Sequence, residues 1–215
     1  MSRDRWRFVL AVSVALSTPA CGRSVEVRDA APRSAPGASR GAFAMTYYWV
    51  ETQPSGDVPA VELYTRACEM AATVSAAFAK DLALAGTARL LDGRVLGVTG
   101  DCDCPRAPCV RVLPPEQPWG AGQGNRPLVP FESLAIDRNV VPIGTHLYIE
   151  ELDGALLPGL MLAYHDGCVV ADDTGDRMKG NRLDWFVGRE ESYAMLDARL
   201  HLTNVTVYDG GERCP

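Results

Sequence analysis

Short stretches of alternating hydrophobic and polar residues recur along most of the chain, and this pattern predicts strands. Residues 42–50, Ala-Phe-Ala-Met-Thr-Tyr-Tyr-Trp-Val, form a β-branched and aromatic run of the kind found in strands. Shorter strand-like runs follow at 88–91, 94–98 and 109–113. Beyond residue 131 apolar positions again alternate with polar ones, around 142–150, 183–187 and 205–208. We therefore expect a mainly β fold.

One segment differs from this pattern. Residues 60–84 are rich in Ala, Leu, Glu and Lys and contain neither Gly nor Pro. This composition, with Gly86 shortly after it, predicts a helix. Residues 114–130 are rich in Pro and Gly and are expected to form a loop. Many short strands with one helix and no internal repeat favour a small β-barrel with a helical insertion at about 60–85.

The N-terminus has the composition of an export signal. Three arginines among the first seven residues precede an apolar run at 8–16, and small residues at 17–20 lead to Cys21. A run of this length is too short to span a bilayer. Cleavage near Ala20 gives an ordinary secreted protein. Alternatively, Thr-Pro-Ala-Cys partly resembles a lipobox, and Cys21 is then the lipidated first residue of an envelope lipoprotein.

These features divide the chain into a signal at 1–21, a flexible linker at 22–41 that is rich in Ala, Pro, Ser and Arg, and a folded domain at 42–215. The formal net charge of −6 argues against a nucleic-acid partner. Seven cysteines in 215 residues point to an oxidising compartment. The six that remain without Cys21 can close three disulfides, with fifteen pairings possible.

Several carboxylates lie next to or within apolar strands, where they cost desolvation free energy unless they have a role. If they converge, burial and mutual repulsion raise the pKa of one of them, so that it stays protonated near neutral pH. A protonated carboxylic acid is what cleavage of a glycosidic bond requires. A simpler explanation is that Asp137 and Asp173 cap turns. The candidates are Asp137, Asp166, Asp172, Asp173 and Asp184.

Two stretches resemble the signatures of a known family. Residues 133–145, Ser-Leu-Ala-Ile-Asp-Arg-Asn-Val-Val-Pro-Ile-Gly-Thr, resemble the first signature of the three-aspartate (3D) domain, and residues 171–186 resemble the second. The second contains Asp-Thr-Gly followed by Lys-Gly-Asn-Arg-Leu-Asp, which is far more specific than Asp-Thr-Gly alone. The resemblance implies a six-stranded double-psi β-barrel, the catalytic barrel of membrane-bound lytic transglycosylases of the A type.

The resemblance also implies residue roles. The three signature aspartates fall on Asp137, Asp173 and Asp184, with the catalytic acid and base on Asp173. Residues 176–178, Asp-Arg-Met, depart from the family pattern beside that acid. The chain also lacks the length for the large second domain that forms the glycan groove in long members. Substrate contacts are expected from Asp166, Thr174, Gly175, Lys179, Asn181, Arg182 and Trp119.

The implied activity is cleavage of the bond between N-acetylmuramic acid and N-acetylglucosamine in peptidoglycan, with closure of a 1,6-anhydro ring. This reaction needs no external water, no cofactor and no metal. The expected partners are peptidoglycan glycan strands and, through the lipid, a membrane. The expected location is the cell envelope, as an exported monomer.

Two other functions remain open. A barrel that binds or loosens the wall without cutting it is favoured by Asp176 and Arg177 beside the acid. An aspartic protease is suggested by the single Asp-Thr-Gly, but this requires a symmetric dimer. A metal site at His165 and Cys168, or at the Cys102–Cys109 cluster, is less favoured than disulfides in an exported chain.

Overall fold

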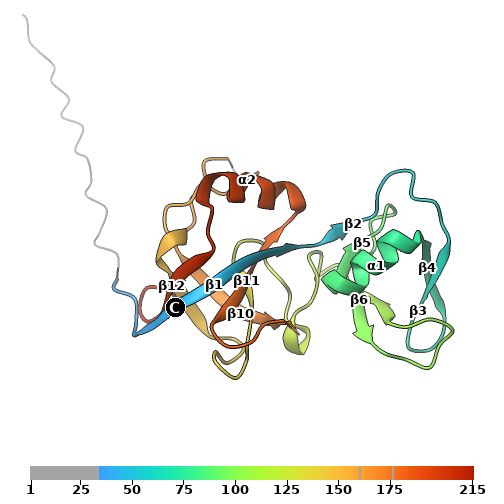
Figure 1. The fold of residues 1–215 in the computed structure, drawn as a ribbon, viewed down its shortest axis with the longest axis horizontal. Coiled ribbons are helices and arrows are strands. Elements are labelled where there is room, and N and C mark those ends of the chain that lie inside the picture. The colour runs from blue at the N-terminus through green and yellow to red at the C-terminus, as the bar shows by residue number, and fades with distance from the viewer. Residues whose placement is uncertain (1–33, 160, 176) are drawn as a thin grey trace, which may run out of the picture. The chain divides into compact units, whose positions relative to one another are not determined.

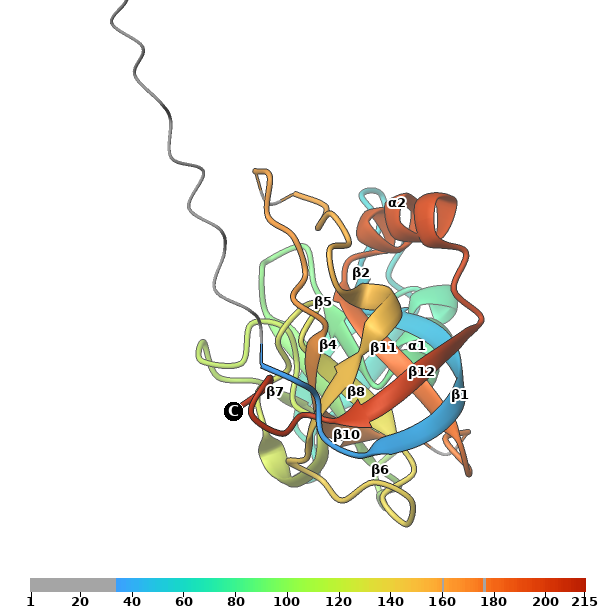
Figure 2. The ribbon, with the colours of Figure 1, turned by 90° about the vertical axis from the view of Figure 1, so that its left-hand side faces the viewer.

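Six strands close into a barrel (Figures 1 and 2). Two of the six neighbouring pairs, Ser39–Trp49 with Arg182–Gly188 and Ser133–Ile136 with Cys168–Thr174, are parallel and the other four pairs are antiparallel. The predicted fold class, a mainly β six-stranded barrel, is confirmed. Around the barrel the strands are β1 (Ser39–Trp49), β11 (Arg182–Gly188), β8 (Ser133–Ile136), β10 (Cys168–Thr174), β9 (His146–Ile149) and β12 (Asn204–Asp209).

This computed structural model describes residues 34–159, 161–175 and 177–215. The predicted signal, the lipidation site Cys21 and most of the predicted linker lie outside the described residues. No helix formed by the described residues has the length and hydropathy needed to cross a membrane.

The side chains that point into the barrel form its hydrophobic core. Leu134 and Ile136 of β8 and Leu183 and Trp185 of β11 are fully buried there. Since side chains alternate along a strand, the residues between them face the outside of the barrel. Helix α2 (Glu190–Leu200) packs against β1 and β11.

Between β1 and β8 the chain forms a second set of elements, here called the inserted lobe (residues 51–113). Its core contains Val74, Phe78, Leu82 and Leu96. The elements are a four-stranded sheet of β2 (Glu51–Thr52), β5 (Thr87–Arg89), β6 (Val95–Gly100) and β7 (Cys109–Val112), a hairpin of β3 (Val61–Tyr64) and β4 (Met70–Val74), and helix α1 (Ala76–Ala85).

The prediction of a helix over 60–84 is wrong for the first half of this range. The hairpin β3–β4 occupies it, because buried Val61 and Leu63 alternate with exposed residues and face buried Ala72 and Val74. A helix would scatter these four side chains around its axis. Helix α1 begins only after Ser75, whose hydroxyl caps it by accepting from the backbone N–H of Phe78 at 3.1 Å.

The end of this helix is as predicted. Gly86 adopts a left-handed conformation with φ of 78°, and its N–H donates to the carbonyl of Leu82. The predicted strands at 88–91, 94–98 and 109–113 correspond to β5, β6 and β7. The predicted strand at 42–50 corresponds to β1, which begins three residues earlier, at Ser39.

Three disulfides form, as the cysteine count allowed. They join Cys68 to Cys104, Cys102 to Cys109 and Cys168 to Cys214. The sulfurs of the Cys102–Cys109 cluster lie close enough to ligate a metal, but each is held in a disulfide and offers no thiolate. The first two disulfides pin the inserted lobe, and the third joins the start of β10 to the C-terminus.

Candidate active site

A row of outward-facing residues crosses four neighbouring strands of the barrel. Asp173 of β10 lies opposite Ala135 of β8, Ala135 lies opposite Asp184 of β11, and Asp184 lies opposite Thr46 of β1. Since adjacent strands are about 4.8 Å apart, the Cα atoms of Asp173 and Asp184 are about 10 Å apart. The barrel therefore brings two of the three signature aspartates onto one face.

A bulge in β10 turns Asp173 outward. Ala171 pairs with Leu134 and Asp173 pairs with Ala135, so Asp172 is an extra residue in the ladder. Ala171 is buried in the barrel core. In a regular strand Asp173 would face the same side as Ala171, two positions before it. The bulge changes this alternation and aims the carboxyl of Asp173 at the outer face.

Asp172, at the bulge, is buried, and each of its carboxylate oxygens accepts a hydrogen bond. Its Oδ1 accepts from Nε of Arg126 at 2.6 Å, and its Oδ2 accepts from the hydroxyl of Ser133 at 2.9 Å. Ser133 Oγ in turn accepts from the backbone N–H of Val129 at 2.9 Å. This carboxylate therefore fastens the end of the 114–130 loop to the barrel beside Asp173.

The same loop covers Asp173. Gly122 packs so closely that a Cβ there would lie 2.4 Å from the carbonyl oxygen of Asp172 and 3.1 Å from Cβ of Asp173. The next residue, Gln123, begins the short 3-10 helix η1 (Gln123–Asn125), and its side-chain oxygen accepts from the hydroxyl of Thr174 at 3.3 Å. Only glycine allows this approach, which removes Asp173 from much of the solvent.

Burial raises the pKa of Asp173 to about 6, and the charges of Asp172 and Asp184 act in the same direction. Two hydrogen bonds act against it. The backbone N–H of Thr174 donates to Oδ1 at 2.8 Å, and the hydroxyl of Tyr48 lies 3.4 Å from Oδ2. A carboxyl with this pKa exchanges a proton near neutral pH, as a general acid and base must.

Tyr48 places an aromatic hydroxyl beside this acid. Burial and the charges of Asp173 and Asp184 hold the pKa of Tyr48 well above its usual value, so the phenol stays protonated and donates. Its ring lies 5.0 Å from that of Phe186, on the same outer face. The sequence analysis did not select Tyr48, because the pairing of β1 with β11 is what brings it near Asp173.

Asp184 is the second carboxyl of the row. Burial raises its pKa, while a hydrogen bond from Thr46 and the charge of Arg182 oppose this shift. Its Oδ1 is buried, and no hydrogen-bond partner for it occurs among the described residues. An acceptor left in this state costs free energy unless a ligand or a proton satisfies it.

Asp137 follows the last residue of β8 and caps a turn. Its Oδ1 accepts from the N–H of Asn139 at 2.9 Å, and its Oδ2 accepts from the N–H of Gly180 at 2.9 Å. These bonds lower its pKa. Within the described ranges no interaction joins Asp137 to Asp173 or Asp184. The capping alternative therefore describes its contacts, and it ties the turn before β11 to the end of β8.

The other signature residues lie around that turn. Lys179, Asn181 and Arg182 are exposed, and the amide of Asn181 donates to the carbonyl of Ala42 at 3.3 Å. Gly175 is exposed next to Thr174. Of the residues that depart from the family pattern, residue 176 lies outside the description, Arg177 is exposed and Met178 is buried.

One predicted substrate contact, Asp166, is not brought to Asp173. Asp166 precedes β10, whereas Asp173 is near its far end, about 20 Å along the strand. Its Oδ1 accepts from the N–H of Cys168 at 2.9 Å. Trp119 packs against the small cluster of Val50, Leu128 and Phe186, and the guanidinium groups of Arg89 and Arg189 lie 5.5 and 5.4 Å from its ring centre.

The chain is similar to known proteins in one segment of its sequence and in its fold. Residues 132–196 match the model of the 3D domain family. No curated protein matches the sequence. The structure of Escherichia coli MltA with bound chitohexaose matches with a TM-score of 0.53 and 16% identity, over 79% of this chain and 71% of that one. A membrane-bound lytic murein transglycosylase from Agrobacterium tumefaciens matches with a TM-score of 0.49 and 15% identity, over 82% and 74%.

Residues 132–196 are therefore similar to a 3D domain, and the fold of the chain is similar to that of MltA. The resemblance seen in the two sequence signatures is confirmed. All three signature aspartates fall inside the matched residues.

Proposed function

We propose that this protein is a peptidoglycan lytic transglycosylase that uses Asp173 as its acid and base. The observation that carries the proposal is a carboxyl with a pKa of about 6, aimed outward by a bulge and set in one row with Asp184. The 3D match and the MltA-like fold support the class of reaction.

The reaction follows from one group acting twice. Protonated Asp173 donates to the oxygen that links N-acetylmuramic acid to N-acetylglucosamine. The bond from the muramic C1 to that oxygen breaks, and an oxocarbenium-like centre forms. The Asp173 carboxylate then takes the proton of the muramic C6 hydroxyl as O6 bonds to C1. The acid regains its proton, and the product carries a 1,6-anhydro ring.

Neighbouring groups tune this carboxyl. The negative charge of Asp184 favours the protonated form of Asp173 and stabilises the cationic centre, and its buried Oδ1 is an acceptor for a substrate N–H or O–H. Tyr48 steadies the carboxylate form through its hydroxyl. We assign Asp137 a positioning role, because it holds the turn that carries Lys179.

Substrate groups are expected around the open edge of the row. Thr174 and Gly175 follow the acid directly, and Lys179, Asn181 and Arg182 offer donors and positive charge for acetamido, lactyl and peptide carboxylate groups. We further propose that the protein is exported to the cell envelope, is held there through lipid on Cys21 and acts as a monomer.

The test is digestion of purified peptidoglycan sacculi, with soluble products identified by mass spectrometry. The variants are Asp173→Asn, Asp184→Asn and, as a matched control, Asp103→Asn, an exposed carboxylate of the inserted lobe. We expect anhydro-muramic products from wild type and Asp103→Asn, and none from Asp173→Asn. If wild type and Asp173→Asn both bind sacculi and neither releases products, the protein is a wall-binding barrel and the proposal fails.

A further inference from the structure

An apolar hairpin projects between η2 (Glu150–Leu152) and β10, visible in Figure 2 as the loop that extends beyond the barrel. The sequence from 154 to 165 contains no Asp, Glu, Lys or Arg, in a chain that is 22% charged. Its two arms are paired: the N–H of Leu157 donates to the carbonyl of Ala163 at 2.9 Å, and the N–H of His165 donates to that of Ala155 at 2.8 Å.

The outer end of this hairpin exposes large apolar side chains. Met161 is 97% exposed, Leu162 77% and Tyr164 62%. Leu162 has a φ of 52°, which is unfavourable for a leucine. Exposed apolar side chains gathered on one feature mark an interaction surface more often than scattered ones do. Here Met161, Leu162 and Tyr164 are called the apolar tip.

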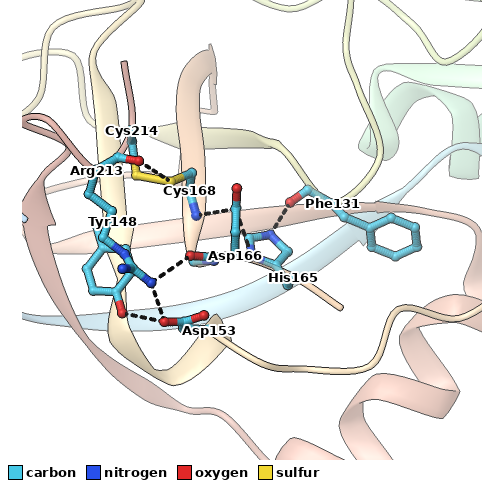
Figure 3. The surroundings of a disulfide bond; sticks show 9 residues. Phe131, Tyr148, Asp153, His165, Asp166, Cys168, Arg213 and Cys214 are labelled. Carbon is cyan, nitrogen blue, oxygen red and sulfur yellow. Dashed lines mark hydrogen bonds and ion pairs between the residues drawn. A yellow bond between two sulfur atoms is a disulfide. The ribbon is translucent and has the colours of Figure 1, made fainter. Parts of the chain in front are cut away.

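Several side-chain contacts and a disulfide hold the base of the hairpin, as Figure 3 shows. Arg213 forms an ion pair with Asp153, and the hydroxyl of Tyr148 donates to the same carboxylate at 3.0 Å. The guanidinium of Arg213 lies 4.5 Å from the ring centre of Tyr148. The disulfide between Cys168 and Cys214 closes this side of the barrel. These contacts connect the base of the hairpin to the barrel and to the C-terminus.

A buried histidine fixes the second arm. Nε2 of His165 lies 2.7 Å from the carbonyl of Phe131, and its Nδ1 accepts from the N–H of Gly167 at 2.8 Å. The indole N–H of Trp185 donates to the same Phe131 carbonyl at 2.8 Å. Burial lowers the pKa of His165, which keeps the imidazole neutral. This arm is therefore anchored to the barrel core.

We propose that the apolar tip inserts into the polar–apolar interface of a lipid bilayer. Two aliphatic side chains with a tyrosine at their margin are the composition that enters such an interface. The chain offers a way to hold the tip there. From Cys21, the expected lipid site, residues 22–38 reach at most about 60 Å to the start of β1.

The net charge of −6 argues that insertion relies on apolar contact and not on attraction to anionic lipids. The hairpin and Asp173 lie at opposite ends of β10, with Cys168 at the near end, about 17 Å from Asp173 along the strand. A tip in the bilayer therefore leaves the candidate active site facing away from it. The proposal does not depend on the activity of that site.

The test uses the full chain in neutral phosphatidylcholine vesicles that contain brominated lipid, which quenches nearby tryptophan. Tyr164→Trp places the probe at the tip, and Leu84→Trp places a matched probe at an exposed leucine of α1. We expect vesicles to quench the added fluorescence at 164 and not at 84. Adding Met161→Asp and Leu162→Asp to Tyr164→Trp is expected to reduce this quenching at least about fivefold.

Salt separates the apolar from the electrostatic mode of binding. Quenching at 164 is expected to persist in about 1 M NaCl, where the Debye length is about 3 Å. Equal quenching at both positions, no quenching at 164, or its loss in salt would each overturn the proposal. A dimer in vesicle-free solution that the Met161→Asp substitution dissociates would also overturn the proposal, because the tip would then bind a second copy of the chain. The tip side chains are exposed, so unchanged thermal melting confirms that the variants fold.

Discussion

At the residue scale, the chemistry of the candidate active site depends on the carboxyl of Asp173, which can be protonated or ionised near neutral pH. Burial under a loop and the charges of two neighbouring carboxylates raise the pKa of Asp173. The N–H of Thr174 acts in the other direction, because it donates a hydrogen bond to the carboxylate. The second signature identified Asp173 and Asp184 because it is one contiguous stretch of sequence that contains both residues. The signatures could not distinguish Asp137 from these two residues. Its role as a cap depends on the position of Gly180 in space.

The raised pKa of Asp173 has a cost that stability measurements can detect. The folded protein binds this proton more tightly than the unfolded chain does, since the pKa rises from 3.8 to about 6. The stability contributed by the protonated group is therefore present at low pH and lost as the pH rises from about 4 to about 6. Asp173→Asn removes this loss.

We expect Asp173→Asn to be more stable than wild type by about 2–3 kcal/mol at about pH 7.5, relative to the difference at about pH 4. Urea unfolding at both pH values measures this. Parallel pH dependence in the two proteins would show that Asp173 has an ordinary pKa when folded.

Asp184 contributes to the upper pH limit of activity in this account, beside the larger effect of burial on the pKa of Asp173. If protonated Asp173 is the acid, the rate of sacculus clearing declines above about pH 6 in wild type. Asp184→Asn removes a negative charge that raises the pKa of Asp173. The decline is then expected to move to lower pH, by on the order of half a unit. A decline that stays in place or moves upward would contradict this role for Asp184.

At the element scale, the bulge in β10 and the 114–130 loop make the site together. The bulge aims Asp173 outward, and the loop covers it through the contact of Gly122 and the ion pair of Arg126 with Asp172. The sequence predicted a Pro- and Gly-rich loop here but not its purpose. Nothing local in the sequence shows that Arg126 and Asp172 meet across 46 positions.

Gly122→Ala tests this cover. The added Cβ would meet the carbonyl of Asp172, which is backbone and cannot move aside. We expect a loss of about 1–3 kcal/mol in stability, and a lower pKa of Asp173, because the displaced loop exposes it. The pH dependence of sacculus clearing and urea unfolding measure both effects.

Gly124→Ala is the matched control in the same loop. Gly124 has a φ of 68° and open space around its Cβ position. We expect a cost of about 1 kcal/mol from backbone strain and no change in the pH dependence of activity. An identical pH shift in both variants would mean that the loop does not act through its contact with Asp172.

At the scale of the whole molecule, the barrel is assembled from strands far apart in the sequence. β1 pairs with β11 and β12, which follow the inserted lobe and most of the barrel. The strand patterns and the family signatures predicted the barrel class. They did not predict that 60–74 forms a hairpin, because Ala and Glu favour a helix locally while the core and the Cys68–Cys104 disulfide favour β pairing.

The disulfide between Cys168 and Cys214 supports this assembly. It closes a loop of 46 residues and joins the start of β10 to the C-terminus. Loop-closure entropy predicts that the double substitution Cys168→Ser and Cys214→Ser lowers the free energy of unfolding by about 2–4 kcal/mol. Urea unfolding checks this, and an unchanged midpoint would show that the bond does not constrain the unfolded chain.

The central claim is that Asp173 closes an anhydro ring without water, and product analysis in ¹⁸O-labelled water tests it most directly. Sacculi digested by wild type are predicted to release anhydro-muramic products that carry no label and are one water lighter than hydrolysis products. Asp173→Asn is predicted to release neither. Reducing-end products that carry ¹⁸O would contradict the account, because a water molecule would then be the nucleophile.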